Sequence, residues 1–178
     1  MRIILLLSLL TWITFSCDRK DGKIELRESI SSFEDSIRKL SNNLQPGERI
    51  PSVLNQELIE LLVSYYHKYP DDVHAPEYLD KVHLMYSAMK NYSLSAKYAD
   101  TILLKYKNYI NRNFILESQA SAYDIFIKPR DTSKVRYYNE LLLEENKDLP
   151  KEKIEEIKFR LRNLHLSIDE IISTQITK

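Results

Sequence analysis

The sequence predicts an all-helical protein made of stacked helical hairpins. Apolar residues recur every three or four positions along most of the chain, which is the spacing of amphipathic helices. Short polar or proline-containing turns separate these stretches, and no stretch alternates with period two as a strand would. Only two of the 178 residues are glycine. We therefore expect helices joined by tight polar turns and no sheet.

The first sixteen residues form an export signal by composition. A single basic residue, Arg2, precedes the apolar run IILLLSLLTWI. This run is shorter than the roughly 20 apolar residues that a membrane-spanning helix needs, so residues 1–16 are predicted to be a signal peptide. The only cysteine of the chain, Cys17, follows directly. A lone cysteine in an exported protein has no disulfide partner in its own chain and calls for another explanation.

The residues before Cys17 resemble the signal of bacterial lipoproteins. Ser16 fits the small position before the cysteine, whereas Thr14 and Phe15 depart from the usual residues. Such relaxed signals are similar to those of Bacteroidota lipoproteins. The resemblance implies that Cys17 is lipidated with acyl chains such as palmitate, becomes the N-terminus and anchors the protein in the outer membrane. A secreted protein with a free thiol is the alternative.

Three segments follow from this organisation: a signal peptide (1–16), a lipidated N-terminus and tether (17–25), and a helical domain (26–178). The start of the tether, 17–23, is mostly charged, which is typical of a spacer. The first helix of the domain has a narrow apolar seam from Leu26 to Leu44, with apolar residues four and three positions apart in turn. We expect the seam to pack on the next hairpin; a coiled-coil dimer is the alternative.

Prolines and capping residues mark the limits of the other helices. Pro70 ends one helix, and Pro76 suits the first turn of the next, where a missing N–H has no cost. Asp131 is a predicted N-cap, and Ser167 with Glu170 forms a capping-box pattern. Helices are expected at about 53–69, from Pro76 to the turn at Lys90-Asn91, at about 94–106, at about 113–128, after Asp131, from Pro150 and from Ser167.

The helices on either side of Lys90-Asn91 match the tetratricopeptide pattern in part. Suitable residues stand at Leu79, Val82, Tyr86, Tyr92 and Ala99, whereas His83, Ser95 and Lys107 depart from the pattern. The same pattern of residues recurs around Leu58 and around Val135, which lie 37 residues before and 40 residues after Ser95. These intervals exceed the 34 residues of the standard repeat, and extra loop residues can absorb the difference.

From Tyr65 to Ile171 the chain resembles a family of tetratricopeptide lipoproteins of Bacteroidota. The shared features are a Tyr-Pro pair, a polar turn followed by APEYL, and the segment NLHLSIDEII at 163–172. The chain is more distantly similar to the tetratricopeptide lipoprotein of the outer-membrane β-barrel assembly machinery. The resemblance implies a tetratricopeptide-like right-handed helical-hairpin solenoid, with about three hairpins and a C-terminal capping helix.

Catalytic and metal-binding patterns are absent from the sequence, so we predict neither a catalytic residue nor a cofactor. The four histidines are scattered without metal-ligand spacing: His67, His74, His83 and His165. His83 is expected to be a hydrogen-bonded core residue. The acidic pairs Asp71-Asp72 and Glu144-Glu145 are expected to be solvated caps. Lysine and arginine balance aspartate and glutamate at 26 each, which does not favour nucleic-acid binding.

Among the residue types of this chain, the twelve tyrosines are the best candidates for forming a binding surface. Most should pack in the core, but Tyr69, Tyr78 and Tyr106, near turns or helix ends, are candidates for lining a binding groove. We expect an adaptor, anchored in the membrane by lipid, that binds another cell-envelope protein. A module that holds a peptide or glycan ligand is the alternative, and an enzyme of unrecognised type is a third reading. The oligomeric state stays open.

Overall fold

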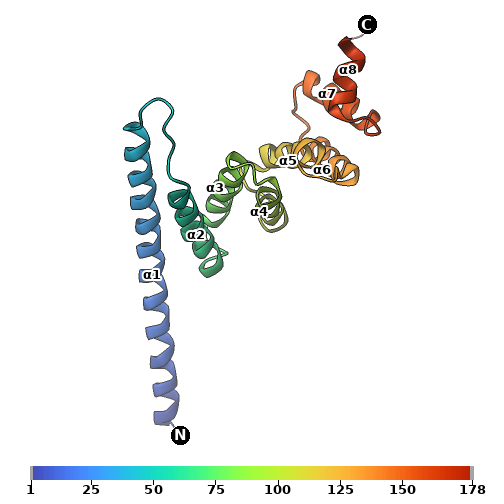
Figure 1. Ribbon diagram of the computed structural model, residues 1–178. Coiled ribbons are helices and arrows are strands. Elements are labelled where there is room, and N and C mark those ends of the chain that lie inside the picture. Colours follow the sequence, from blue (N-terminus) through green and yellow to red (C-terminus); the bar gives the residue numbers. More distant parts are fainter. Residues whose placement is uncertain (1, 177–178) are drawn as a thin grey trace. The chain divides into compact units, whose positions relative to one another are not determined.

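A computed structural model describes the backbone of residues 2–176 and the side chains of residues 22–173. Over this part the chain has eight α-helices, one π-helix and no strand (Figure 1), which confirms the predicted all-helical class. The elements are α1 (Arg2–Asn42), α2 (Ser52–Lys68), α3 (Ala75–Ala88), α4 (Tyr92–Lys105), α5 (Arg112–Ser121), η1 (Ala122–Phe126), α6 (Thr132–Glu145), α7 (Lys151–Arg162) and α8 (Ile168–Ile176).

The chain divides into two compact units, Met1–Val82 and His83–Lys178. In the first unit, α1 and α2 run side by side in opposite directions and are joined by a loop (Figure 1). Their shared core includes Ile30 of α1 and Leu62 of α2, which are 1% and 0% exposed. The first part of α3 adds further fully buried residues, Leu79 and Val82. The narrow seam expected after Leu26 thus contributes to packing within the chain.

Helix α1 begins earlier than the sequence analysis predicted. We expected its start at Leu26, whereas the helical backbone begins at Arg2 and runs through the predicted tether, 17–25. Residues 2–25 contain no proline and only one glycine, Gly22, so nothing in them breaks the helical hydrogen bonds. The side chains of the predicted signal peptide and of Cys17 lie outside the described residues, and their roles stay predictions.

The predicted helix limits near the two prolines are confirmed. Helix α2 ends at Lys68, and the backbone N–H of Tyr69 donates to the Tyr65 carbonyl at 2.8 Å before Pro70 stops the helix. Helix α3 starts at Ala75, which places Pro76 in its first turn. This geometry fixes a short turn between α2 and α3.

Capping side chains position the helices of the second unit. The Asn91 side chain accepts from the Leu94 amide at 3.3 Å at the start of α4, and Asp131 accepts from the Lys134 amide at 3.0 Å at the start of α6. Before α8, the Ser167 amide donates to Glu170 at 2.7 Å, and the Glu170 amide donates to the Ser167 hydroxyl at 3.2 Å. The cap at Asp131 and the capping box are therefore confirmed.

The predicted fifth helix, 113–128, is divided in the structure. Helix α5 ends at Ser121 and is followed by the π-helix η1. Both pack on α6, the neighbour of α5 in Figure 1. The wider turn of a π-helix changes the direction of its side chains, and such turns are frequent at functional sites. The core of this unit is apolar and includes Ala99, Ile102, Ile115, Leu116, Val135 and Leu142.

Candidate binding site around Asp124

The three tyrosines predicted to line a groove lie in different surroundings. Tyr78 is 7% exposed, and its ring meets the ring of Tyr65 edge-on with centroids 4.8 Å apart, so it is a core residue. Burial raises the pKa of Tyr78. Tyr69 is partly exposed, with its hydroxyl 3.3 Å from the position that a Cβ would take on Gly22. Tyr106, also partly exposed, caps α4 in the second unit. Binding by these tyrosines stays a prediction.

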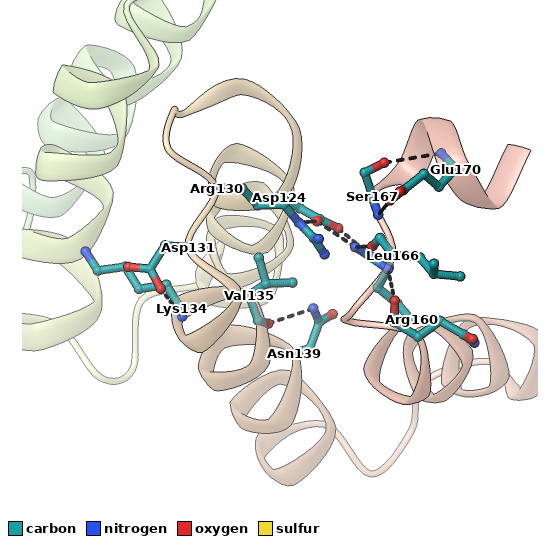
Figure 2. Close-up of polar contacts among 11 residues, drawn as sticks. Asp124, Arg130, Asp131, Lys134, Val135, Asn139, Arg160, Leu166, Ser167 and Glu170 are labelled. Carbon is teal, nitrogen blue, oxygen red and sulfur yellow. Dashed lines mark hydrogen bonds and ion pairs between the residues drawn. The ribbon is translucent and has the colours of Figure 1, made fainter.

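Asp124, on η1, organises a charged cluster that the sequence analysis did not find. Its Oδ1 accepts from Arg130 Nε at 2.7 Å and from Arg160 Nη2 at 2.7 Å. Its Oδ2 accepts from Arg160 Nε at 2.5 Å (Figure 2). The carboxylate is 6% exposed, and the two arginine side chains are 16% and 11% exposed. Asp124 therefore joins η1, the segment before α6, and α7.

Arg160 is fully engaged within this cluster. Besides Asp124, it donates to the carbonyl of Asn163 at 2.8 Å and to the carbonyl of Leu166 at 3.0 Å (Figure 2). These carbonyls follow the end of α7, where backbone acceptors have no helical partner. Arg160 thereby holds the turn between α7 and α8.

Arg130 is only partly engaged. Its Nε donates to Asp124, but its Nη2 is buried without a hydrogen-bond partner. Burial alone would raise the pKa of Asp124, but the hydrogen bonds from Arg160 and Arg130 outweigh it and lower that pKa. One carboxylate thus faces two guanidinium groups, and the cluster of these three residues has an excess positive charge.

A hollow of about 260 Å³, which we call the α6–α7 hollow, lies on one side of the cluster and is lined by α5, η1, α6, α7 and α8. Asp124, Asn139 and Arg160 contribute polar atoms to its lining, and Asn139 donates to the Val135 carbonyl at 2.8 Å (Figure 2). Ile125 and Phe159 are both 41% exposed there. The apolar lining consists mainly of Ile125, Leu142, Ile157, Phe159, Ile168 and Ile171.

A second hollow, of about 370 Å³, also borders the cluster, and we call it the Arg130 hollow. It is formed by the start of α6 and by the turn after α7. Its lining consists of Arg130, Thr132, Ser133, Arg136, Leu164 and His165. Every polar side chain in this set can donate a hydrogen bond, and none is a carboxylate.

The first unit contains a different charged arrangement. Asp72 accepts from Lys23 Nζ at 2.8 Å, from the Tyr65 hydroxyl at 2.8 Å and from the His74 amide at 3.0 Å. Burial alone would raise the pKa of Asp72, but these hydrogen bonds outweigh it and lower the pKa from 3.8 to about 2. The expectation that Asp71-Asp72 is a solvated cap is wrong for Asp72, because Lys23 and Tyr65 approach it from distant parts of the sequence.

A hollow of about 470 Å³ in the same unit lies beside Tyr78 and α1. Its lining mixes Arg27 and Lys81 with three glutamates. Lys81 is already paired there, at 2.9 Å with Glu34 and at 3.3 Å with Glu77. The charges of this hollow are therefore satisfied largely by one another.

His83 occupies the core position that the sequence predicted. It is 1% exposed, its Nδ1 lies 2.8 Å from the Ser95 hydroxyl, and its Nε2 lies 3.2 Å from the Ser118 hydroxyl. Such burial leaves no access for a substrate, so these contacts join helices. Among the described residues, no group of His, Cys, Asp and Glu side chains has the arrangement of a metal site.

Comparison of the chain with protein-family models, curated proteins and solved structures gave no match. Within the described residues, no helix combines the length and apolar character that crossing a bilayer requires.

Proposed function

We propose that this chain is a lipid-anchored scaffold whose second unit binds a segment of another cell-envelope protein. The observation that carries this proposal is the α6–α7 hollow, because apolar residues make up half of its lining and two of them are exposed. These two are Ile125 and Phe159. Exposed apolar groups beside a concavity are typical of sites that bind proteins.

The size of this hollow favours a protein segment over a complete small ligand. Its volume of about 260 Å³ is below the roughly 300–1,000 Å³ of ordinary ligand pockets. It suits one or two anchoring side chains, while the rest of the segment lies across the surface. Lys153 and Glu156, both among the lining residues, carry opposite charges. The expected segment therefore has an apolar anchor flanked by polar residues.

The proposal includes the tetratricopeptide-like arrangement and the membrane anchor. Short helices that follow one another closely support the first, since α3, α4 and α6 have 14 residues each. Stacking of such hairpins buries the face that each leaves uncovered. The lipoprotein-like segment before Cys17 supports the second. Several acyl chains on one cysteine would hold the protein firmly on a membrane.

Partner binding is tested by capture from crosslinked cell envelopes with the whole chain as bait. We expect Ile125→Lys to abolish recovery of a stoichiometric partner, because a charge would enter the apolar edge of the hollow. Ile110→Lys is the matched control, because Ile110 is 90% exposed and does not line the hollow. Equal recovery with both variants would show that the α6–α7 hollow is not the binding site.

The anchor is tested separately by Cys17→Ala. We expect this change to move the protein from the membrane fraction to the soluble fraction, because no acyl chain can be attached to alanine. Cys17→Ala protein that still sediments with membranes would refute lipid anchoring, while the partner experiment would keep its meaning.

A further inference from the structure

The turn between α2 and α3, which we call the α2–α3 turn (69–74), is held against α1. Lys23 Nζ of α1 lies 2.8 Å from the carboxylate of Asp72 in this turn. The hydroxyl of Tyr69 lies 3.3 Å from the position that a Cβ would take on Gly22. The first described side chains of α1 therefore pack on this turn.

The conformation of the turn is fixed by hydrogen bonds. Besides pairing with α1, the Asp72 carboxylate accepts from the Tyr65 hydroxyl at 2.8 Å and from the His74 amide at 3.0 Å. The Ala75 amide donates to the Asp72 carbonyl at 3.0 Å. These bonds hold the backbone on both sides of Val73, so the position of the Val73 side chain on the surface is fixed as well.

Exposed apolar side chains lie at this end of the first unit. Val73 is 82% exposed, the largest fraction among the large apolar side chains described in that unit. Ile24, on α1, is 53% exposed and lines the same hollow as His74, the neighbour of Val73. A single exposed apolar side chain is ordinary. These two gain meaning from their place, because both lie close to the predicted lipid-bearing Cys17 along α1.

The chain between the predicted anchor and the turn is short. Lys23 follows Cys17 by six positions. Six residues of helix span about 9 Å, and six fully extended residues span about 20 Å. The backbone of α1 is helical across this segment. Acyl chains on Cys17 would therefore keep the α2–α3 turn close to the lipid headgroups, where a high effective concentration makes weak contacts sufficient for binding.

The charges at the turn are compatible with a phospholipid surface. Asp72 is paired with Lys23. The neighbouring exposed residues Lys68 and Asp71 carry opposite charges, so neither sign is in excess between them. A lysine can also lay its apolar stem along lipid while its ammonium group stays among the headgroups.

We infer that the α2–α3 turn is a membrane-contact surface that places Val73 in the headgroup layer of the bilayer to which Cys17 is anchored. The inference rests on the lipid anchor of the proposed function, and it adds which face of the first unit the bilayer contacts. Residues 17–23 then act as a short, stiff connection that holds this face on the membrane.

Tryptophan fluorescence in vesicles tests the contact. The whole lipidated chain carries Trp12→Phe, so that Val73→Trp introduces its only indole. The vesicles consist of phosphatidylcholine, with or without bromine on the acyl chains near the headgroup. Val53→Trp is the matched control, because Val53 is 59% exposed at the other end of α2.

The two indoles should respond differently to the quenchers. Since α1 and α2 run in opposite directions (Figure 1), Val53 lies on the side of the unit away from Cys17. It is about 24 Å from the turn along the helix axis, so we expect bromine to quench the Val73→Trp protein at least about threefold more than the Val53→Trp protein. Iodide, which stays in the water, should quench them in the reverse order. Neither exposed substitution disturbs the core.

Failure of this inference and failure of the anchor give different results. Lipid-treated protein that does not sediment with the vesicles would refute the anchor and the membrane contact together. Protein that sediments with the vesicles, but whose Val73→Trp and Val53→Trp forms are quenched equally or not at all by bromine, would overturn only the contact at the α2–α3 turn.

Discussion

Asp72 in the first unit and Asp124 in the second are both poorly exposed carboxylates that join separate helices, but their partners differ. Asp72 receives one cation, Lys23, together with two neutral donors, the Tyr65 hydroxyl and the His74 amide. Asp124 receives only guanidinium groups, from Arg130 and Arg160. The first cluster is balanced in charge, whereas the second has one positive charge in excess.

The two clusters differ in how completely their polar atoms are satisfied within the chain. All the hydrogen bonds at Asp72 connect parts of the chain, and they link α1 and α2 to the turn before α3. At Asp124 one arginine keeps a buried nitrogen without a partner, and a hollow without carboxylates lies beside it. A lowered carboxylate pKa occurs at both clusters and therefore does not distinguish them.

Among the substitutions proposed here, Asp124→Asn is expected to lower the free energy of unfolding most. The change removes the carboxylate that two poorly exposed guanidinium groups share, and breaking a buried ion pair by removing one partner typically costs about 3–5 kcal/mol. We expect the free energy of unfolding to fall by about 3 kcal/mol or more, as measured by urea denaturation with circular dichroism. Asp148→Asn, at an exposed position, is the control and should change it by less than about 0.5 kcal/mol. Equal stability of the two variants would mean that solvent compensates the arginines.

Asp72→Asn is expected to lower the free energy of unfolding by a smaller amount. Asparagine can keep part of the hydrogen bonding, and Lys23 is 35% exposed, so water replaces part of the lost interaction. We expect a loss of about 1–2 kcal/mol in the free energy of unfolding. Asp71→Asn changes the exposed neighbour and should have little effect. A loss at Asp72 as large as that at Asp124 would contradict the distinction between a balanced and an unbalanced cluster.

The stabilising hydrogen bonds of the Asp72 carboxylate should also make the stability of the protein depend on pH. The pKa of this carboxyl is about 2 in the folded protein and 3.8 when unperturbed. The unfolded state therefore binds the proton first as the pH falls. The stabilisation by Asp72 is complete only above about pH 5, and it is lost progressively as the pH falls through the folded pKa of about 2. Urea denaturation between pH 5 and 2 should show a steeper loss of stability in the unchanged protein than in the Asp72→Asn variant. Parallel curves would show that Asp72 is not responsible.

The smallest effect on stability is expected for Arg136→Ala. Arg136 pairs with Glu140 at 3.5 Å, both side chains are exposed, and pairs of this kind contribute about 0–1 kcal/mol. We expect thermal unfolding to change by less than the equivalent of about 0.5 kcal/mol. A large loss of stability would instead assign Arg136 to the fold, together with Arg130 and Arg160.

Local signals in the sequence predicted much of the helical framework. Asp131 and the Ser167 to Glu170 pattern cap helices as expected, because a cap depends on residues within one turn of each other. The burial of His83 also agreed with its place on an apolar face. The π-helix was missed, since residues 122–126 have the same apolar spacing as an ordinary helix.

Few residues of the candidate site could be predicted from the sequence. The position of Tyr78 near a turn predicts a groove residue, yet its ring packs against Tyr65 in the core. Asp124 is an acidic residue within the apolar stripe of a predicted helix, and this is the one local signal that points to it. Its partners lie 6 and 36 residues away, and no local pattern connects Asp124 to Arg160.

By itself, the sequence determined the helical class, most helix limits and the prediction of a lipid-bearing Cys17, because periodicity, caps and signal segments are written in neighbouring residues. The tertiary structure decided which charges are buried together and which donors are left unused. It also decided where hollows open beside them. These properties depend on distances between residues far apart in the chain, which are set by packing and not by local spacing.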